Sequence, residues 1–160
     1  MTVRLVGPDD WAAVREARLQ ALADSPSAFA STLDRELAFD ETEWRRRLTD
    51  GPWWLAEDAG RPVGLVAVYP RDDGTDERHL VAMWVAPSSR GTSTATDLVE
   101  AVCAWAVRTG AATVALWVVD GNDRARRFYE RLGFVLTGER QPLPTDPRVD
   151  EELMRRTLRA

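Results

Sequence analysis

The chain has 160 residues, 44% of them hydrophobic and 29% charged, which fits one globular domain and disfavours wholesale disorder. A formal net charge of -5 counts against nucleic acid as a partner. Arginine supplies every basic side chain apart from one histidine, and Cys103 is the only cysteine. Lysine chemistry, an intrachain disulfide and a cysteine-built metal site are therefore excluded, and no metal is expected. The chain shows no signal pattern and no apolar run of membrane-spanning length, so we expect a soluble cytoplasmic protein without a membrane partner.

The first part of the chain predicts a strand, two helices and the loop that joins them. Residues 2–6 alternate as a short strand does, and Asp9 or Asp10 then caps a helix that runs to about Ala23. The buried stripe of this helix is expected to hold Trp11, Val14, Arg18, Ala21 and Leu22. A small polar loop over 24–32 precedes a short helix over 40–48, which has acids first and arginines last, as the helix dipole favours.

The middle of the chain predicts a hairpin and a strand–helix–strand unit. Strands over 53–57 and 63–69 turn at Ala59-Gly60, and a polar turn follows over 71–78. The next strand, which begins at His79, is apolar at nearly every position, which predicts burial on both faces. A helix from about Thr92 to Thr109 and a strand over 113–119 come next, so these two strands should be parallel neighbours.

The end of the chain predicts one helix and two closing strands. The helix is capped by Asn122 or Asp123 and ends at Gly133. Strands over 134–140 and 150–158 are expected to flank a proline-rich loop over 141–147. The whole pattern is one α+β domain on a mixed sheet.

The stretch "VAPSSRGTSTATDL" (85–98) joins a strand to a helix and carries no acid before Asp97. The predicted helix start is thus free of a resident carboxylate, which suits a bound phosphate group. A plain Ser/Thr helix cap explains the same residues equally well. A Walker motif is excluded because it needs lysine. A Rossmann fingerprint is excluded as well, because it needs three glycines after an early strand.

Two segments together resemble the GNAT family of N-acetyltransferases. "WVAPSSRGTSTATDLVEAVCAWAVRTG" is similar to the family's coenzyme A-binding segment, with Arg90, Gly91 and Ala95 in matching places. Ser93 stands where that family usually has a second glycine. "LWVVDGNDRARRFYERLGFVLTG" is similar to the strand, Asn-x-x-Ala-x-x-x-Tyr helix and Gly-Phe exit that follow in the family. The resemblance covers roughly the C-terminal half of the chain.

The resemblance implies a single N-acetyltransferase domain over residues 1–160, with a mixed central sheet, a splayed parallel strand pair and flanking helices. It implies acetyl-CoA as cofactor and direct attack by an amine in a ternary complex. Backbone groups of Met83, Trp84 and Val85 would bind pantetheine, and the Val85 N–H would polarise the thioester carbonyl. The pyrophosphate would be held by backbone N–H groups of Arg90, Gly91, Thr92, Ser93, Thr94, Ala95 and Thr96.

Catalytic residues follow partly from the resemblance and partly from residue chemistry. By resemblance Tyr129 protonates the departing thiolate, and Asn122 bonds the pantetheine arm beside the small Ala125. Seven residues separate Asn122 from Tyr129, which predicts one shared helix face. Two residues are candidates for the general base. One is His79, because a histidine titrates near neutrality, and the other is Glu77, two residues earlier on the same strand face.

The predicted function is therefore acetyl transfer to a primary amine of a small molecule or peptide. Two alternatives stay open: a non-catalytic acyl-CoA sensor of the same fold, and an enzyme that uses a longer acyl-CoA. A homodimer is also left open. Loops over 24–32 and 71–77 are expected to set the acceptor, and Cys103 is expected to be a small buried hydrophobe. Five tryptophans are candidates either for the acceptor pocket or for the core, namely Trp44, Trp53, Trp54, Trp84 and Trp117.

Overall fold

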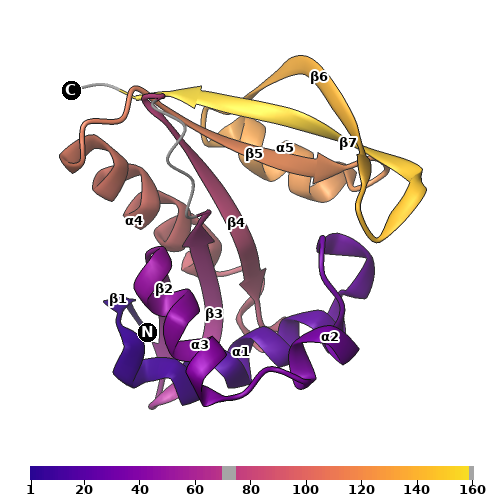
Figure 1. Ribbon diagram of the computed structural model, residues 1–160. Coiled ribbons are helices and arrows are strands. Elements are labelled where there is room, and N and C mark those ends of the chain that lie inside the picture. Colours follow the sequence, from indigo (N-terminus) through magenta and orange to yellow (C-terminus); the bar gives the residue numbers. More distant parts are fainter. Residues whose placement is uncertain (70–74, 159–160) are drawn as a thin grey trace.

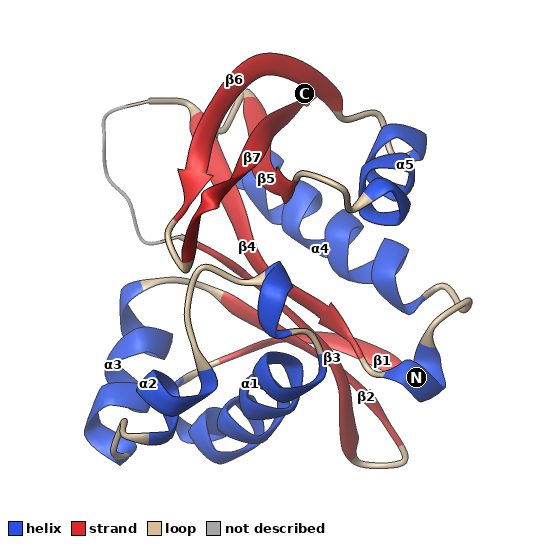
Figure 2. Ribbon diagram, turned by 90° about the vertical axis from the view of Figure 1, so that its right-hand side faces the viewer, coloured by secondary structure: helices blue, strands red, loops and turns tan. Residues whose placement is uncertain are grey.

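A computed structural model describes residues 1–69 and 75–158, in which a seven-stranded mixed sheet separates two sets of helices (Figures 1 and 2). The spatial order of the strands is β1-β2-β3-β4-β5-β7-β6, and only β4 and β5 run parallel to each other. The strands are β1 (Thr2–Val6), β2 (Trp53–Asp58), β3 (Arg61–Val68), β4 (Glu77–Val85), β5 (Thr113–Val119), β6 (Val135–Leu143) and β7 (Asp146–Thr157).

The helices cover opposite faces of the sheet (Figure 2). One face packs against α1 (Trp11–Asp24), α2 (Leu33–Leu37) and α3 (Glu41–Asp50), and the other against α4 (Thr94–Arg108) and α5 (Asp123–Arg131). Each face has its own hydrophobic core. Within residues 1–69 and 75–158, no helix has the length and apolar character that a membrane crossing requires.

The two parallel strands separate soon after they begin. Pairing between β4 and β5 extends only from Glu77↔Thr113 to His79↔Ala115, and beyond it the strands diverge (Figure 1). The register of β4 against β3 shifts around Ala82, whose φ of 60° lies in the left-handed region. An extra residue of this kind bends a strand and increases its twist. The bulge therefore turns β4 away from β5 and opens the sheet in the middle.

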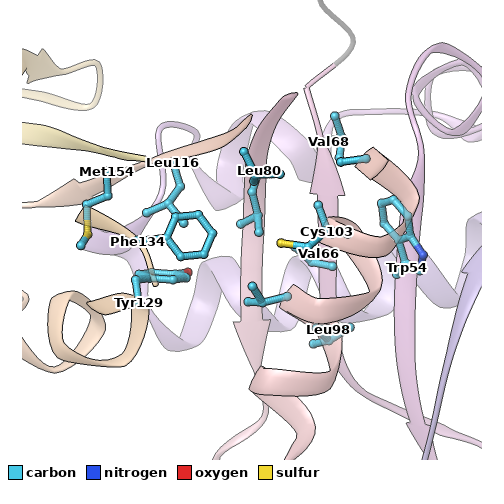
Figure 3. Packing of buried hydrophobic residues seen from close by; sticks show 14 of the residues in the cluster. Trp54, Val66, Val68, Leu80, Leu98, Cys103, Leu116, Tyr129, Phe134 and Met154 are labelled. Atoms are coloured by element: carbon cyan, nitrogen blue, oxygen red, sulfur yellow. The ribbon is translucent and has the colours of Figure 1, made fainter. Parts of the chain in front are cut away.

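The core beneath α4 and α5 joins the two halves of the opened sheet (Figure 3). Cys103 is buried on α4, and burial raises the pKa of its thiol to about 11, which confirms the predicted small hydrophobe. Tyr129 lies in the same core, edge-on to Phe134 with ring centroids 5.7 Å apart. Other buried members are Trp54, Val66, Val68, Leu80, Leu98, Leu116 and Met154.

Most predicted elements are confirmed, including the strand–helix–strand unit with its parallel strands. The hairpin turns at Ala59-Gly60, where both residues have positive φ (51° and 76°), as a tight two-residue turn requires. The predicted stripe of α1 is also buried at Val14, Arg18 and neighbouring positions, although Trp11 is only half-buried.

Three sequence predictions need correction, and one helix was not predicted at all. The helix α2 lies between the predicted loop over 24–32 and the predicted helix over 40–48, and its start is capped by the Thr32 side chain, which accepts from the Arg35 N–H. Strand β4 begins at Glu77 and is half-buried over residues 81–83, because it borders a cleft. The proline-rich loop is largely strand, since β6 and β7 leave only residues 144–145 between them. Helix α4 begins at Thr94 rather than Thr92. Residues 71–74 of the predicted polar turn lie outside the described residues.

Candidate functional site

The open edge of β4 is the first component of the site. Ala86 N–H donates to the Val63 carbonyl of β3 over 2.7 Å, so Val85, one residue earlier, directs its own N–H and carbonyl to the opposite edge. Met83 lies two residues before Val85, so its backbone N–H and carbonyl point to the same edge of the strand. That edge faces the gap toward β5, where the β4–β5 pairing has already ended. The backbone of Met83 and the Val85 N–H therefore offer an extended ligand the bonds that a neighbouring strand would normally make, whereas the Val85 carbonyl already accepts a bond from the Arg90 side chain. Between them, the Trp84 side chain packs in the core beneath α1.

The loop between β4 and α4 is largely exposed. Gly91 has φ of +80°, which favours glycine, whereas Ser93 has φ of -75° and meets no such restriction. Serine is thus compatible with this backbone at the position where the family usually has glycine. The Thr92 hydroxyl donates to the Ser89 carbonyl over 2.5 Å and lies 2.9 Å from the Thr94 hydroxyl. The loop is consequently held in shape by its own hydroxyl groups.

The helix start is not free of carboxylates, contrary to the sequence prediction. Because α4 begins at Thr94, Asp97 falls in its first turn. Its carboxylate accepts a hydrogen bond from the Ser93 hydroxyl over 3.0 Å. Ala95 and Thr96, which the sequence places in the phosphate loop, are half-buried in this turn, and Thr94 is buried.

The Arg90 side chain turns back toward α1. Its Nε donates to the Val85 carbonyl over 3.0 Å, and its guanidinium pairs with Asp24 at the end of α1. Asp24 also accepts from Trp84 Nε1 over 3.1 Å. Bonds from Trp84, Ser25 and Arg90 together lower the pKa of the Asp24 carboxyl. Arg90 thus connects the phosphate-type loop to the start of the 24–32 loop, and a direct phosphate contact would require it to leave Asp24.

Tyr129 lies deep beneath the sheet, on α5. Figure 3 shows its ring below Phe134, with the hydroxyl pointing toward the side of Leu80 and Leu98 rather than toward Met154. Burial raises the pKa of the phenol, so the group stays protonated at neutral pH. A protonated phenol can donate a proton, which is the role that the sequence resemblance implies.

The structure does not place Asn122 on the buried face that holds Tyr129. Asn122 is exposed and caps α5, where its side-chain oxygen accepts from the Ala125 N–H over 3.2 Å. It lines a small cavity of about 40 Å³ together with residues 118–121. Its side-chain amide nitrogen is the group left to bond a ligand at this end of the gap.

A cleft of about 1020 Å³ opens on the sheet face opposite α4. It is floored by β4, β5 and β7 and lined by His79, Val81 and Trp117, among others. The Thr145 hydroxyl donates to the Phe29 carbonyl over 3.2 Å and so ties the β6–β7 turn to the loop after α1. Glu77 and His79, the two candidates for the general base, both line this cavity, beside the point where β4 and β5 separate.

Glu77 and His79 differ in what surrounds them. Arg155, hydrogen-bonded to the Glu77 carboxylate, lowers its pKa, and burial opposes this only in part. Arg155 Nη2 lies 3.1 Å from Glu77 Oε1, and the Thr113 hydroxyl donates to Oε2 over 2.8 Å. His79 Nε2 lies 3.5 Å from Glu77 Oε1. Because Arg155 and Thr113 already bind the Glu77 carboxylate, it is a weak base, but it is well placed to orient the imidazole of His79.

A second lobe of about 600 Å³ continues the cleft toward α1 and α3. Both lobes are lined by Ala30, Tyr69, Val81, Trp117 and Glu151. Of the five candidate tryptophans, Trp117 and Trp53 line the cleft, and Trp53 also belongs to a core, as do Trp44, Trp54 and Trp84.

The second lobe is lined by arginines that the sequence did not mark as functional, and two of them bind the buried Glu36, which does not itself line the lobe. Glu36 accepts from Arg18 through two bonds of 3.0 Å and from Arg47 through one of 2.8 Å. Burial alone would raise the pKa of Glu36, but the two arginines outweigh it and lower it to about 2. Glu151 is buried at the junction of the lobes, and desolvation raises the pKa of its carboxyl. An arginine on the apolar stripe of α1 was the one signal for this group, whereas nothing local distinguishes Glu36 or Glu151.

Comparison with known proteins identifies the fold. The acetyltransferase (GNAT) family model matches residues 17–134. An uncharacterized N-acetyltransferase of Mycobacterium tuberculosis is 34% identical over 120 residues, which cover 74% of each chain. A GNAT-family acetyltransferase from Streptococcus pneumoniae superimposes with a TM-score of 0.83 at 19% identity, covering 99% of each chain. A putative acetyltransferase from Salmonella typhimurium, solved with its cofactor acetyl-CoA, gives a TM-score of 0.78 at 21% identity, covering 100% of this chain and 95% of that chain.

An opened mixed sheet with an unpaired strand edge beside a cleft is thus the architecture of an acetyltransferase. The chain belongs to the acetyltransferase (GNAT) family, and the resemblance of its two sequence segments is confirmed.

Proposed function

We propose that this chain transfers the acetyl group of acetyl-CoA to a primary amine of a small molecule or peptide, by direct attack within a ternary complex. The observation that carries the proposal is the unpaired edge of β4 at Met83 and Val85, which lies beside a cleft that contains His79. The acetyl-CoA bound to the structural neighbour from Salmonella typhimurium supports the choice of cofactor.

The residues present fit coenzyme A. Its pantetheine arm has amide groups along an extended chain, which suit the outward-facing backbone of Met83 and Val85. Backbone N–H groups of the exposed loop from Arg90 to Ser93, with Thr94, Ala95 and Thr96 following in the first turn of α4, suit the pyrophosphate. When bound, acetyl-CoA supplies an acyl group that is activated as a thioester.

The protein's own groups then transfer the protons and stabilise the negative charge that develops. In the overall reaction the acceptor nitrogen forms a bond to the acetyl carbon, and the carbon–sulfur bond breaks. His79 takes the proton that the ammonium must lose, and Glu77 holds the imidazole in place. The Val85 N–H donates to the carbonyl oxygen as negative charge grows there. Tyr129 would give its proton to the departing sulfur and regain one from the second proton that the acceptor nitrogen loses after it has bonded to the acetyl carbon; the raised pKa of the buried phenol favours this return.

The experiment is a thiol-release assay with acetyl-CoA and a panel of primary amines, run beside calorimetry of CoA binding. We expect CoA to bind and to be released only when an acceptor is present, with the acetylated amine identified by mass spectrometry. Binding without release from any acceptor would favour the acyl-CoA sensor instead. Faster release from propionyl- or butyryl-CoA would favour the use of a longer acyl chain.

A further inference from the structure

The two lobes of the cleft carry opposite charge. The larger lobe, which we call the acidic lobe, is lined by two arginines, Arg140 and Arg155, and by four carboxylates, those of Asp76, Glu77, Glu139 and Glu151. The smaller lobe, which we call the basic lobe, has two lining carboxylates, Asp50 and Glu151, and four arginines, namely Arg18, Arg35, Arg46 and Arg47. A positive lobe is unexpected in a chain whose net charge is -5.

The carboxylates around the basic lobe are distributed unevenly among its arginines. Two guanidinium groups, on Arg18 and Arg47, share the single carboxylate of Glu36. Arg18 is 6% exposed, and its Nη1 has no hydrogen-bond partner within the described residues. A buried cationic donor without a partner is costly, and a bound anion removes that cost. Arg46, by contrast, is already paired with Glu43 and Asp50.

Glu151 supplies the opposite charge where the lobes meet. It is 6% exposed, and Gln141 Nε2 donates to its Oε1 over 2.6 Å. Among the lining residues that both lobes share, it is the one that carries a charge. A ligand ammonium near Glu151 would also lie in the acidic lobe that contains His79.

We propose that the acceptor is a small zwitterion of the amino-acid type, whose carboxylate lies among Arg18, Arg35 and Arg47 while its ammonium faces Glu151. This inference rests on the proposed transferase function and names the substrate class for it. The shared walls of the cleft include Tyr69 and Trp117, whose rings suit an apolar or cationic side chain.

The cleft favours a small molecule, rather than the terminus of a protein, as the acceptor that carries the carboxylate and the ammonium. The hydrogen bond from Thr145 to Phe29 joins the two segments that border the cleft, 116 residues apart in sequence. Lobes of about 1020 and 600 Å³ are of the size that small ligands occupy. A peptide amine with an acidic residue nearby is the competing acceptor, and the assay below includes one.

The test uses matched acceptors in the thiol-release assay: leucine against isopentylamine, phenylalanine against phenethylamine, and a short peptide with an acidic second residue. The carboxylate contributes charge-assisted bonds, so we expect kcat/KM to be about ten-fold or more higher for each amino acid than for its decarboxylated partner. Equal or faster turnover of the decarboxylated amines would overturn the proposal. Preferred turnover of the peptide would also overturn it.

Variants then locate the carboxylate. Arg35→Gln is exposed and should fold normally, and Arg47→Gln removes a half-buried donor. Each should raise KM for amino acids about ten-fold while it leaves kinetics with decarboxylated amines unchanged. Arg108→Gln, at the exposed end of α4, is the control and should change neither. An unchanged KM for amino acids in both cleft variants would contradict the assignment.

A binding measurement distinguishes failure of the proposed acceptor subsite from failure of the proposed transferase function. Calorimetry of leucine and of isopentylamine with the CoA-loaded protein requires no turnover. Binding of leucine that is weakened by Arg35→Gln, even if no acceptor releases CoA, would support the anion subsite while the transferase function fails. The absence of leucine binding, with CoA bound and other amines acetylated, would leave the transferase function and overturn the subsite.

Discussion

Removal of the carboxylate of Glu36 should destabilise the protein more than removal of any surface acid. Glu36 is 1% exposed and binds both Arg18 and Arg47, so Glu36→Gln leaves one buried and one half-buried guanidinium group without this counter-charge. The pKa of Glu36 is lowered from an ordinary 4.5 to about 2, which corresponds to about 3 kcal/mol of stability at neutral pH. Breaking a buried pair by removing one partner costs a similar amount, about 3–5 kcal/mol.

In a domain of this size, about 3 kcal/mol should lower Tm by roughly 6–12 °C. Calorimetric unfolding at pH 7 measures this difference, with Glu130→Gln as control because its pair with Arg126 is exposed and contributes at most about 1 kcal/mol. A Tm within about 2 °C of the parent protein would refute the reasoning.

The pH dependence provides a second readout of the same group. The folded pKa of Glu36 lies below its unfolded value, so its contribution is fully present above about pH 4.5 and is lost as pH falls toward about 2. Unfolding of the parent protein should therefore show this loss, and the difference between parent and Glu36→Gln should shrink across that range. A difference that stays constant from pH 6 to pH 3 would show that the carboxylate acts through packing rather than charge.

Four further substitutions test the proposed chemistry. Arg90→Glu should weaken CoA binding by about 1.5–3 kcal/mol in calorimetry, because it places a carboxylate beside the phosphate loop and near Asp24; unchanged affinity would remove that loop from the site. Tyr129→Phe should keep the fold and CoA affinity but lower kcat by roughly 10²–10⁴-fold, and full activity would exclude the phenol as acid. His79→Ala should lower the rate mainly near neutral pH, with partial recovery in alkaline buffer. If only Glu77→Gln changes the pH–rate profile, Glu77 is the base.

Local sequence patterns predicted those parts of the fold that local interactions form. Hydrophobic periodicity placed α1, α4 and β5, and the glycine after α4 marked its end. The short helix α2 was missed because five residues carry too little periodicity, although Thr32 is a recognisable cap. The prolines before residue 147 indicated a loop, yet Pro142 lies in β6, an edge strand, where a missing N–H is tolerated.

The candidate site could be predicted where a motif marks it and not where distant segments create it. The positions of the loop around Arg90 and of Tyr129 could be predicted from sequence, whereas their roles stay predictions. The bulge that opens the sheet falls on Ala82, a residue type with no preference for positive φ, so nothing local signals it. Arg18 and Glu36 lie 18 residues apart, and Glu151 reaches the cleft only through the pairing of β7 with β5 and β6. Such long-range contacts carry no local pattern.

A crystal structure of the protein with acetyl-CoA is the most direct test of how this chain works. The pantetheine arm should lie in the gap between β4 and β5, hydrogen-bonded to backbone groups of Met83 and Val85. The pyrophosphate should contact backbone N–H groups between Arg90 and Thr96, and the thioester should face the cleft that contains His79. A cofactor bound elsewhere, with β4 and β5 paired beyond His79 and the gap closed, would contradict the account.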